Sequence, residues 1–390
     1  MKNSEKIGRG RFVALIGFLL VLVAGATGGI CSLVRRVLWQ MGEEVSPQLR
    51  EKFSKLPNYS GGVFRNSQPT TVNLKKGGFS PRLLRHLFAS PNRPTTVVPQ
   101  VALTKRDFAS VPAEFSVRWL GHSTMIFELA GMRFITDPVF GNAAPIPFAV
   151  SRYCESPLSR QQLPKLDFVL ITHDHYDHLE MATVEFLSRQ QRDLKFVTML
   201  GVGGHLKKWG VAPENVVELN WGESVALGRL KIRAVESRHF SGRSFGARDT
   251  TLWGAFIFEF ETTDSAGATT TRKVFHGGDG GYGEHFKKIG DNYGGFDLVC
   301  LEIDAWNENW RGHHMFPQDA VKAFGELRGK VLLPMHWGVF DLAMHPWNES
   351  VGILAREAAA HGVAAAFPKM GELVSLAEPA TPLPQAHWWE

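Results

Sequence analysis

The sequence is poor in cysteine: Cys31, Cys154 and Cys300 are the only three among its 390 residues. None of them stands in a C-x-x-C pair, which argues against a zinc site built from cysteines, and the odd number argues against a framework of disulfide bonds. Cys300 lies within the apolar run 296–301, so we expect it to be a small buried hydrophobic residue.

The sequence also lacks long runs of like charge, a basic stripe interleaved with aromatic residues, and an internal repeat. The first two absences argue against a nucleic-acid partner, and the third argues against a repeat architecture. Hydrophobic residues make up 44% and charged residues 21% of the chain, which is typical of a globular protein. The net charge of +5 is a mild excess that favours an anionic surface or a phosphate-bearing substrate.

An apolar segment without charge, residues 12–34, stands near the N-terminus. It fits a cleaved export signal, with 24–26 as the cleavage site. It also fits a membrane anchor, because at about 1.5 Å per residue it can cross a hydrocarbon layer of roughly 30 Å. Arg35 and Arg36 follow it directly and favour the anchor. Four basic residues among the first 11 favour a cytoplasmic N-terminus. We therefore expect residues 1–36 to be a signal or anchor of a membrane-associated protein, with the catalytic domain outside the cytoplasmic membrane.

Residues 37–114 read as an N-terminal arm that wraps the main domain. The stretches 57–62 and 90–96 are rich in turn-forming residues. Between them, residues 81–88 have the spacing of a short amphipathic helix.

From residue 115 to the end at 390 the pattern is that of a mixed α and β domain. Alternating or continuous apolar runs predict strands, and helical spacing predicts helices. We expect strands at 116–120, 125–129, 132–137, 167–171, 195–200, 230–235, 253–260, 273–275, 296–303 and 330–333, and helices at 181–187, 317–327 and 350–360. This order suggests two sheets with helices on the outside.

The most informative stretch runs from Thr172 to Leu179 and has the pattern H-x-H-x-D-H. The apolar run 166–171 before it predicts a buried strand, so the pattern stands on the loop at the carboxyl end of that strand. Solvated surface loops rarely carry so many metal-binding side chains together. The four that define the pattern are His173, His175, Asp177 and His178.

Three further residues of metal-binding type, His239, Asp279 and His336, each stand just beyond another predicted strand. Alone, each would be read as a loop or capping residue. Their shared placement predicts that they complete a metal centre, which needs protein ligands on several sides. Glycines on both sides of Asp279 would let the backbone and the metal approach closely.

These motifs resemble the metallo-β-lactamase fold superfamily, and within it the N-acyl-phosphatidylethanolamine phospholipase D group. The segments that carry the resemblance are 119–124, 136–140, 172–179, 276–282 and 335–340. The resemblance implies an α+β fold, namely a four-layer αββα sandwich, with residues 115–390 as the hydrolase domain.

The resemblance also implies two metal sites. His173, His175 and His239 would hold one metal. Asp177, His178 and His336 would hold the other, and Asp279 would bridge the two. Imidazole and carboxylate ligands suit two Zn²⁺ ions, with iron or manganese as alternatives.

Further residues carry roles by the same resemblance. His122 and Asp137 would orient ligand imidazoles. His314, together with Asp177 and Asp279, would be catalytic. The family has an acidic residue where Phe316 stands, so the loop of His314 departs from the family pattern. Among the neighbours of these residues, Asp174, Tyr176 and Asp304 are expected to be structural or surface residues.

The expected function is that of a phosphodiesterase of phospholipase D type. A hydroxide shared between the two metals would attack the phosphorus of an N-acyl-phosphatidylethanolamine-like lipid. The alternative is a lactonase or carboxylic-ester hydrolase, because the same centre can attack a carbonyl carbon. The expected partners are thus a phospholipid or small-molecule ester and a membrane, with no nucleic acid; the oligomeric state stays open.

Overall fold

A computed structural model describes residues 29, 31–70, 90–146, 149–244, 246–263, 267–377 and 381–390. The chain divides into two compact units, Met1–Gly42 and Glu43–Glu390. Residues 31–40 are helical, whereas most of the predicted segment 12–34 and the helix expected at 81–88 lie outside the described residues. Within the described ranges, no helix combines the length and the apolar character needed to cross a membrane.

The larger unit contains a seven-stranded sheet in which the first half is antiparallel and the second half is parallel. Its strands, in spatial order, are β15 (Leu373–Ser375), β3 (Phe115–Trp119), β4 (Met125–Leu129), β5 (Met132–Thr136), β6 (Phe168–Ile171), β7 (Lys195–Met199) and β8 (Val216–Leu219). Every residue of β6 is buried, as expected for a central strand with a layer on each face.

A six-stranded sheet stands beside the first. Its strands, in spatial order, are β14 (Leu332–Met335), β13 (Leu298–Glu302), β12 (Thr269–His276), β11 (Ala255–Thr263), β10 (Leu230–Val235) and β9 (Ser224–Leu227). The pairs β12–β13 and β13–β14 are parallel and the others are antiparallel.

Aromatic side chains form the core between the two sheets. The ring of Phe258 on β11 lies 4.9 Å from that of Phe134 on β5 and 5.8 Å from that of Phe127 on β4. Phe260 and Phe115 make a third contact across the same gap, with ring centres 5.2 Å apart. These rings exclude water and hold the sheets face to face.

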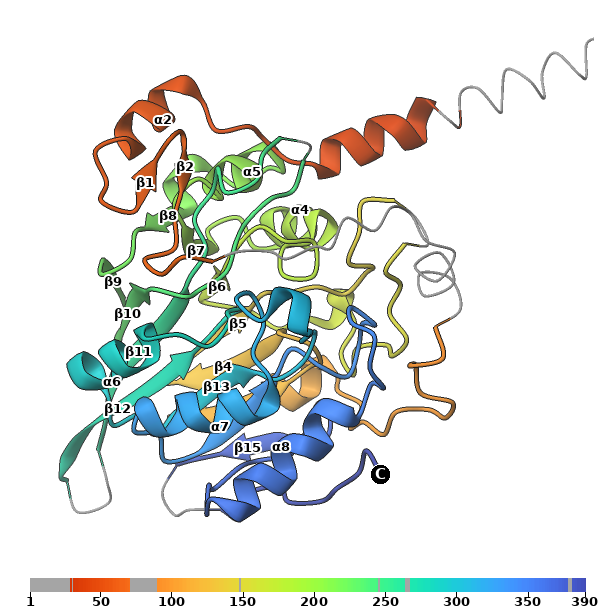
Figure 1. Cartoon of the computed structure of the whole chain (residues 1–390), viewed down its shortest axis with the longest axis vertical. Coiled ribbons are helices and arrows are strands. Elements are labelled where there is room, and N and C mark those ends of the chain that lie inside the picture. The colour runs from red at the N-terminus through yellow and green to blue at the C-terminus, as the bar shows by residue number, and fades with distance from the viewer. Residues whose placement is uncertain are drawn as a thin grey trace, which may run out of the picture. The chain divides into compact units, whose positions relative to one another are not determined.

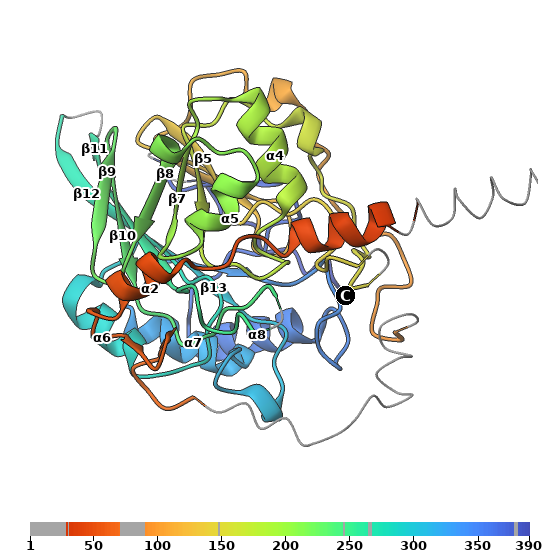
Figure 2. The same ribbon diagram turned by 90° about the horizontal axis from the view of Figure 1, so that it is seen from above.

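Helices cover the outer faces of the two sheets (Figures 1 and 2). The helices α4 (Met181–Gln190) and α5 (Gly203–Lys208) lie on the side of the seven-stranded sheet. The helices α6 (His285–Tyr293), α7 (Pro317–Glu326) and α8 (Glu349–Ala360) lie on the side of the six-stranded sheet. The αββα sandwich that the sequence predicted is thereby confirmed.

The remaining elements are short and lie in the loops and in the N-terminal arm. They are α2 (Pro47–Phe53), β1 (Tyr59–Ser60), β2 (Val63–Phe64) and the 3-10 turns η1 (Lys105–Phe108), η2 (Arg160–Gln162), η3 (Pro213–Asn215) and η4 (Glu308–Trp310). Phe53 and Tyr59 pack on Phe64 with ring centres 5.1 and 4.9 Å away.

Both described parts of the arm, residues 37–70 and 90–114, are hydrogen-bonded to the main domain. The backbone N–H of Phe64 donates to the carbonyl of Asp249 at 2.8 Å. The N–H of Val101 donates to the carbonyl of Met370, also at 2.8 Å. At the other terminus, Trp388 stacks on Trp337 with ring centres 5.2 Å apart.

Candidate metal centre

The loops that carry the seven predicted ligands leave the carboxyl ends of four strands, β6, β10, β12 and β14. The first loop is a tight turn, because the backbone N–H groups of His178 and Leu179 both donate to the carbonyl of His175, at 3.1 and 2.9 Å. Because of this turn, ligand side chains that are close in sequence belong to two neighbouring groups of ligands.

The first group consists of three imidazoles and one carboxylate. Nδ1 of His175 lies 2.8 Å from Nε2 of His173 and 3.2 Å from Nε2 of His239. With an oxygen of Asp279, the ligand atoms of this group all lie within 4.8 Å of one another. Ligands about 2.0–2.1 Å from a tetrahedral zinc ion lie roughly 3.3 Å apart, so this spacing suits one cation.

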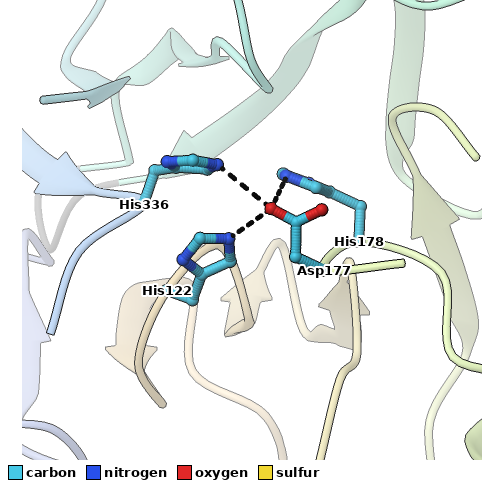
Figure 3. A group of neighbouring side chains, drawn as sticks. All are labelled: His122, Asp177, His178 and His336. Atoms are coloured by element: carbon cyan, nitrogen blue, oxygen red, sulfur yellow. Dashed lines mark hydrogen bonds and ion pairs between the residues drawn. The ribbon is translucent and has the colours of Figure 1, made fainter. Parts of the chain in front are cut away.

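The second group surrounds Asp177 (Figure 3). Its Oδ2 atom lies 3.0 Å from Nε2 of His122 and 3.5 Å from Nε2 of both His178 and His336. The three imidazoles point toward the same carboxylate from three different loops. His122, which the sequence predicted to orient a ligand, thus lies in direct contact with one.

Asp279 lies between the two groups. Its Oδ2 atom is 2.9 Å from Nε2 of His336 and 3.1 Å from Nε2 of His178 in the second group. It is also 3.7 Å from Nε2 of His239 and 3.9 Å from Nε2 of His173 in the first. The structure therefore brings all seven predicted ligands into one centre.

The donor atoms of this centre fit divalent cations. Among the described residues, Oδ1 of Asp279 is buried and makes no hydrogen bond, and Nε2 of His178 and Nε2 of His336 meet only carboxylates of the centre. A buried polar atom without a hydrogen bond costs about 1–3 kcal/mol, which a bound cation would offset. A set of imidazole and carboxylate donors suits zinc, iron or manganese.

The buried charges determine which groups carry protons. Burial by itself would raise the pKa of Asp279, but His178 and His336 hold that pKa well below its usual range. Burial likewise opposes the charged form of His336, yet Asp279 raises the pKa of this imidazole to about 10. Burial lowers the pKa of His173 and of His239 well below the usual value, so both are neutral. Because a cation binds the neutral imidazole, its binding would displace the protons that Asp279 holds on its neighbours.

Asp137 orients one of the ligands, as predicted. Its Oδ2 atom accepts a hydrogen bond from Nδ1 of His178 at 2.8 Å and from the hydroxyl of Thr172 at 2.7 Å. Its Oδ1 atom accepts from the backbone N–H of Thr172 at 2.8 Å. The protonated Nδ1 leaves Nε2 of His178 as the nitrogen that faces the centre.

Glu302, at the end of β13, is a functional candidate that the sequence reasoning missed. It is fully buried, and its Oε2 atom lies 2.7 Å from Nδ1 of His314. Its other oxygen accepts from the N–H groups of Gly280 and Met315 at 2.8 and 3.2 Å. Burial opposes the charge on His314, but Glu302 raises the pKa of His314 above its usual value. A carboxylate that ends an apolar strand run was the signal that could have revealed it.

Residues next to the ligands hold the loops in place from outside the centre. Oδ2 of Asp174 accepts from the hydroxyl of Thr251 at 2.8 Å, and Oδ1 of Asp174 accepts from the N–H of Gly242 at 2.9 Å. The hydroxyl of Tyr176 donates to the carbonyl of Arg243. Asp304 is buried and accepts from Ser350.

The glycine before Asp279 lies against neighbouring segments of the chain. A Cβ at Gly278, whose φ is +57°, would lie 2.9 Å from the carbonyl oxygen of Gly254 and 3.1 Å from Cβ of Thr172. The missing side chain at Gly278 therefore makes room for neighbouring backbone and side chains.

Comparisons with known proteins agree with this architecture. A family model described as "Beta-lactamase superfamily domain" matches residues 132–337, or 206 of 390 residues. An uncharacterized protein of Mycobacterium tuberculosis is 36% identical over 348 residues, which cover 87% of this chain and 89% of that protein. The N-acyl-phosphatidylethanolamine-hydrolyzing phospholipase D 1 of Caenorhabditis elegans is 32% identical over 259 residues, covering 63% of this chain and 70% of that enzyme.

Among solved structures, a possible metal-dependent hydrolase from Veillonella parvula has a similar fold. It superposes with a TM-score of 0.53 at 15% sequence identity and covers 68% of this chain and all of that one (100%). The family model begins with β5 and ends directly after His336, so it spans all seven predicted ligands. The chain therefore belongs to the metallo-β-lactamase superfamily and is a metal-dependent hydrolase.

Proposed function

We propose that this hydrolase is a phosphodiesterase of phospholipase D type that acts on N-acyl-phosphatidylethanolamine-like lipids. The observation that carries the proposal is the similarity to the phospholipase D of Caenorhabditis elegans, whose aligned region covers 63% of this chain. The products would be a phosphatidic acid and an N-acylethanolamine.

In this proposal two divalent cations, zinc or alternatively iron or manganese, bind to the two groups of the centre. They would lower the pKa of a shared water and neutralise charge on the phosphate oxygens. His173, His175 and His239 would hold the first cation. Asp177, His178 and His336 would hold the second, with Asp279 between them.

The protein side chains would manage the protons of the reaction. The phosphodiester gains the hydroxyl of water at phosphorus, and the leaving N-acylethanolamine oxygen needs one proton. His314 is the side chain proposed to donate it, because Glu302 stabilises its protonated form through the 2.7 Å contact with Nδ1. The ring of His314 lies 5.3 Å from that of His336 and 5.1 Å from that of His239, which keeps it beside the centre.

We also propose that residues 1–36 place the protein at a membrane, with the catalytic domain outside the cytoplasmic membrane. The uncharged segment 12–34 supports this, as does the exposure of Leu38 and Trp39, at 57% and 46%, on the helix that follows. Recovery of the full chain in the soluble fraction after cell lysis would contradict it.

One experiment tests the function. The full chain, purified in detergent, is analysed for metal content per chain and then assayed in parallel on an N-acyl-phosphatidylethanolamine and on a lactone. We expect close to two metals per chain and release of the N-acylethanolamine. Turnover of the lactone without turnover of the phosphodiester would refute the phospholipase proposal. Fewer than one metal per chain would refute the dinuclear centre.

A further inference from the structure

A strap in the N-terminal arm, residues 66–70, runs alongside the loop that carries His239. Nε of Arg238 donates to the hydroxyl of Thr70 at 2.9 Å, and another guanidinium N–H donates to the carbonyl of Pro69 at 2.9 Å. Ser67 donates to Glu236. The strap thus contacts two residues, Glu236 and Arg238, of a loop that lies about 170 residues later in the sequence.

Asn66 makes the contact nearest to the metal centre. Its Oδ1 atom accepts from the backbone N–H of His239 at 3.1 Å, and its Nδ2 atom donates to the backbone carbonyl of His239 at 2.8 Å. Oδ1 also accepts from Nε1 of Trp253 at 3.2 Å. The reversed amide would set donors against donors and an acceptor against an acceptor, so the surroundings fix the orientation of the carboxamide.

The backbone of His239 needs such support because it lies in the long connection between Val235, the last residue of β10, and Ala255, the first of β11. No strand ladder holds it. The imidazole is fully buried, and its Nδ1 atom donates to the carbonyl of His313 at 2.8 Å, which directs Nε2 toward the first group. The other polar contacts of the ring, with His175 and Asp279, belong to the first group itself, so the position of the backbone helps to decide where Nε2 lies.

We propose that Asn66 is a positioning residue for the first metal group, acting through the backbone of His239. The N-terminal arm is then part of the metal centre and not only a cover of the main domain. This inference rests on the metal centre alone and holds whichever ester the enzyme cleaves.

Removal of the carboxamide should loosen one of the three imidazole ligands of the first group. Asn66→Ala leaves the N–H and the carbonyl of His239 without their partner and frees the loop to shift. Loss of a group that orients a ligand typically lowers metal affinity by about 10–100-fold. We expect that loss in the first group only, because in the part of the chain that the structure describes no hydrogen bond of the strap reaches the loops of Asp177, His178 or His336.

The test is a titration of Co²⁺ into the metal-free full chain. Calorimetry measures the affinity for each ion, and visible absorption reports the surroundings of the bound Co²⁺. Asn58→Ala is the matched control: Asn58 belongs to the same arm and donates to Oδ1 of Asn220 at 2.8 Å, away from any ligand loop. Thermal unfolding of each metal-free variant verifies that the titrated protein is folded. If Asn66→Ala does not fold, Asn66→Ser is titrated in its place. The serine hydroxyl helps to hydrate the N–H and the carbonyl of His239 that lose their partner.

We expect the Asn66 variant to bind one Co²⁺ with the wild-type affinity and the other about 10–100-fold more weakly, with an altered visible spectrum. The Asn58 variant should give the wild-type isotherm and spectrum. A wild-type isotherm for the Asn66 variant would overturn the proposal. Equal losses in the two variants would also overturn it, because they would reveal a general weakening of the arm. Neither outcome depends on which substrate the enzyme takes.

Discussion

Replacement of Asp279 by asparagine probes the point at which the two groups of the centre meet. The change keeps the volume of the side chain and removes one negative charge beside four imidazoles. The affected oxygen lies 2.9 and 3.1 Å from Nε2 of His336 and His178, and 3.7 and 3.9 Å from Nε2 of His239 and His173.

The size of the effect follows from that position. A group that only orients a ligand typically contributes about 10–100-fold to metal affinity or activity. Asp279 contacts imidazoles of both groups, so we expect Asp279→Asn to lower metal affinity and hydrolysis by more than about 100-fold. This corresponds to more than about 2.8 kcal/mol. The fold should persist, because the side chain stands on a loop and its volume is kept.

The assay combines three measurements on the variant and on a control, Asp291→Asn, which changes an exposed carboxylate paired with Lys287. Metal per chain is determined after dialysis against buffered zinc, hydrolysis is measured on the best substrate, and circular dichroism reports the fold of the metal-free protein. Two bound metals with unchanged hydrolysis in Asp279→Asn would refute the reasoning. Loss of the native circular dichroism would show instead that the carboxylate is needed for folding.

Three further predictions test the surroundings of the centre and the core. Asp137→Ala removes the acceptor that lies 2.8 Å from Nδ1 of His178, so the affinity of the second group should fall about 10–100-fold in a metal titration; an unchanged affinity would contradict the orienting role. His314→Gln should lower kcat by about 100-fold or more and leave the metal content near the wild-type value, as expected for a proton donor; a wild-type kcat would remove it from the reaction. Phe258→Ala removes a ring that packs 4.9 Å from that of Phe134 across the two sheets, so urea unfolding should show a loss of about 3–5 kcal/mol. A loss below about 1 kcal/mol would show that this contact does little for the core.

The central strands could be predicted from the sequence because they are buried on both faces and therefore read as apolar runs. The bounds of β4 and β10 are those that the sequence predicted. The strands β8, β9 and β15 were missed because each is a short strand at the edge of a sheet and is only partly buried, so no long apolar run marks it. Pairing with a neighbour, more than local preference, makes such short segments strands.

Two helices among the described residues of the region 115–390 were also missed, for local reasons. The helix α5 has six residues and carries two glycines in its first turn, which weakens the helical signal. The helix α6 follows the glycine-rich stretch 277–283 and contains Gly290. A Cβ at Gly290 would clash with the backbone of Glu326, so close packing on the neighbouring helix α7 explains the glycine.

Within the centre, the ligand candidates could be found from residue type and from position at strand ends. Glu302 and Asn66 could not be identified as functional candidates in the same way. Glu302 acts through His314, which is 12 residues later, and Asn66 acts through the backbone of His239, 173 residues away. A hydrogen bond between distant segments leaves no periodic trace in the sequence.

The amino-acid sequence by itself determined which side chains of metal-binding type exist and that they follow apolar strand runs, because hydrophobic pattern and residue chemistry are local properties. The resemblance to a family supplied the division of these side chains into two groups. Only the tertiary structure decided the distances within each group and which ring nitrogen faces inward. The inward nitrogen depends on acceptors such as Asp137 and the carbonyl of His313, and folding alone brings these beside His178 and His239. The link between the N-terminal arm and the centre through Asn66 has the same origin, since only packing places the two segments side by side.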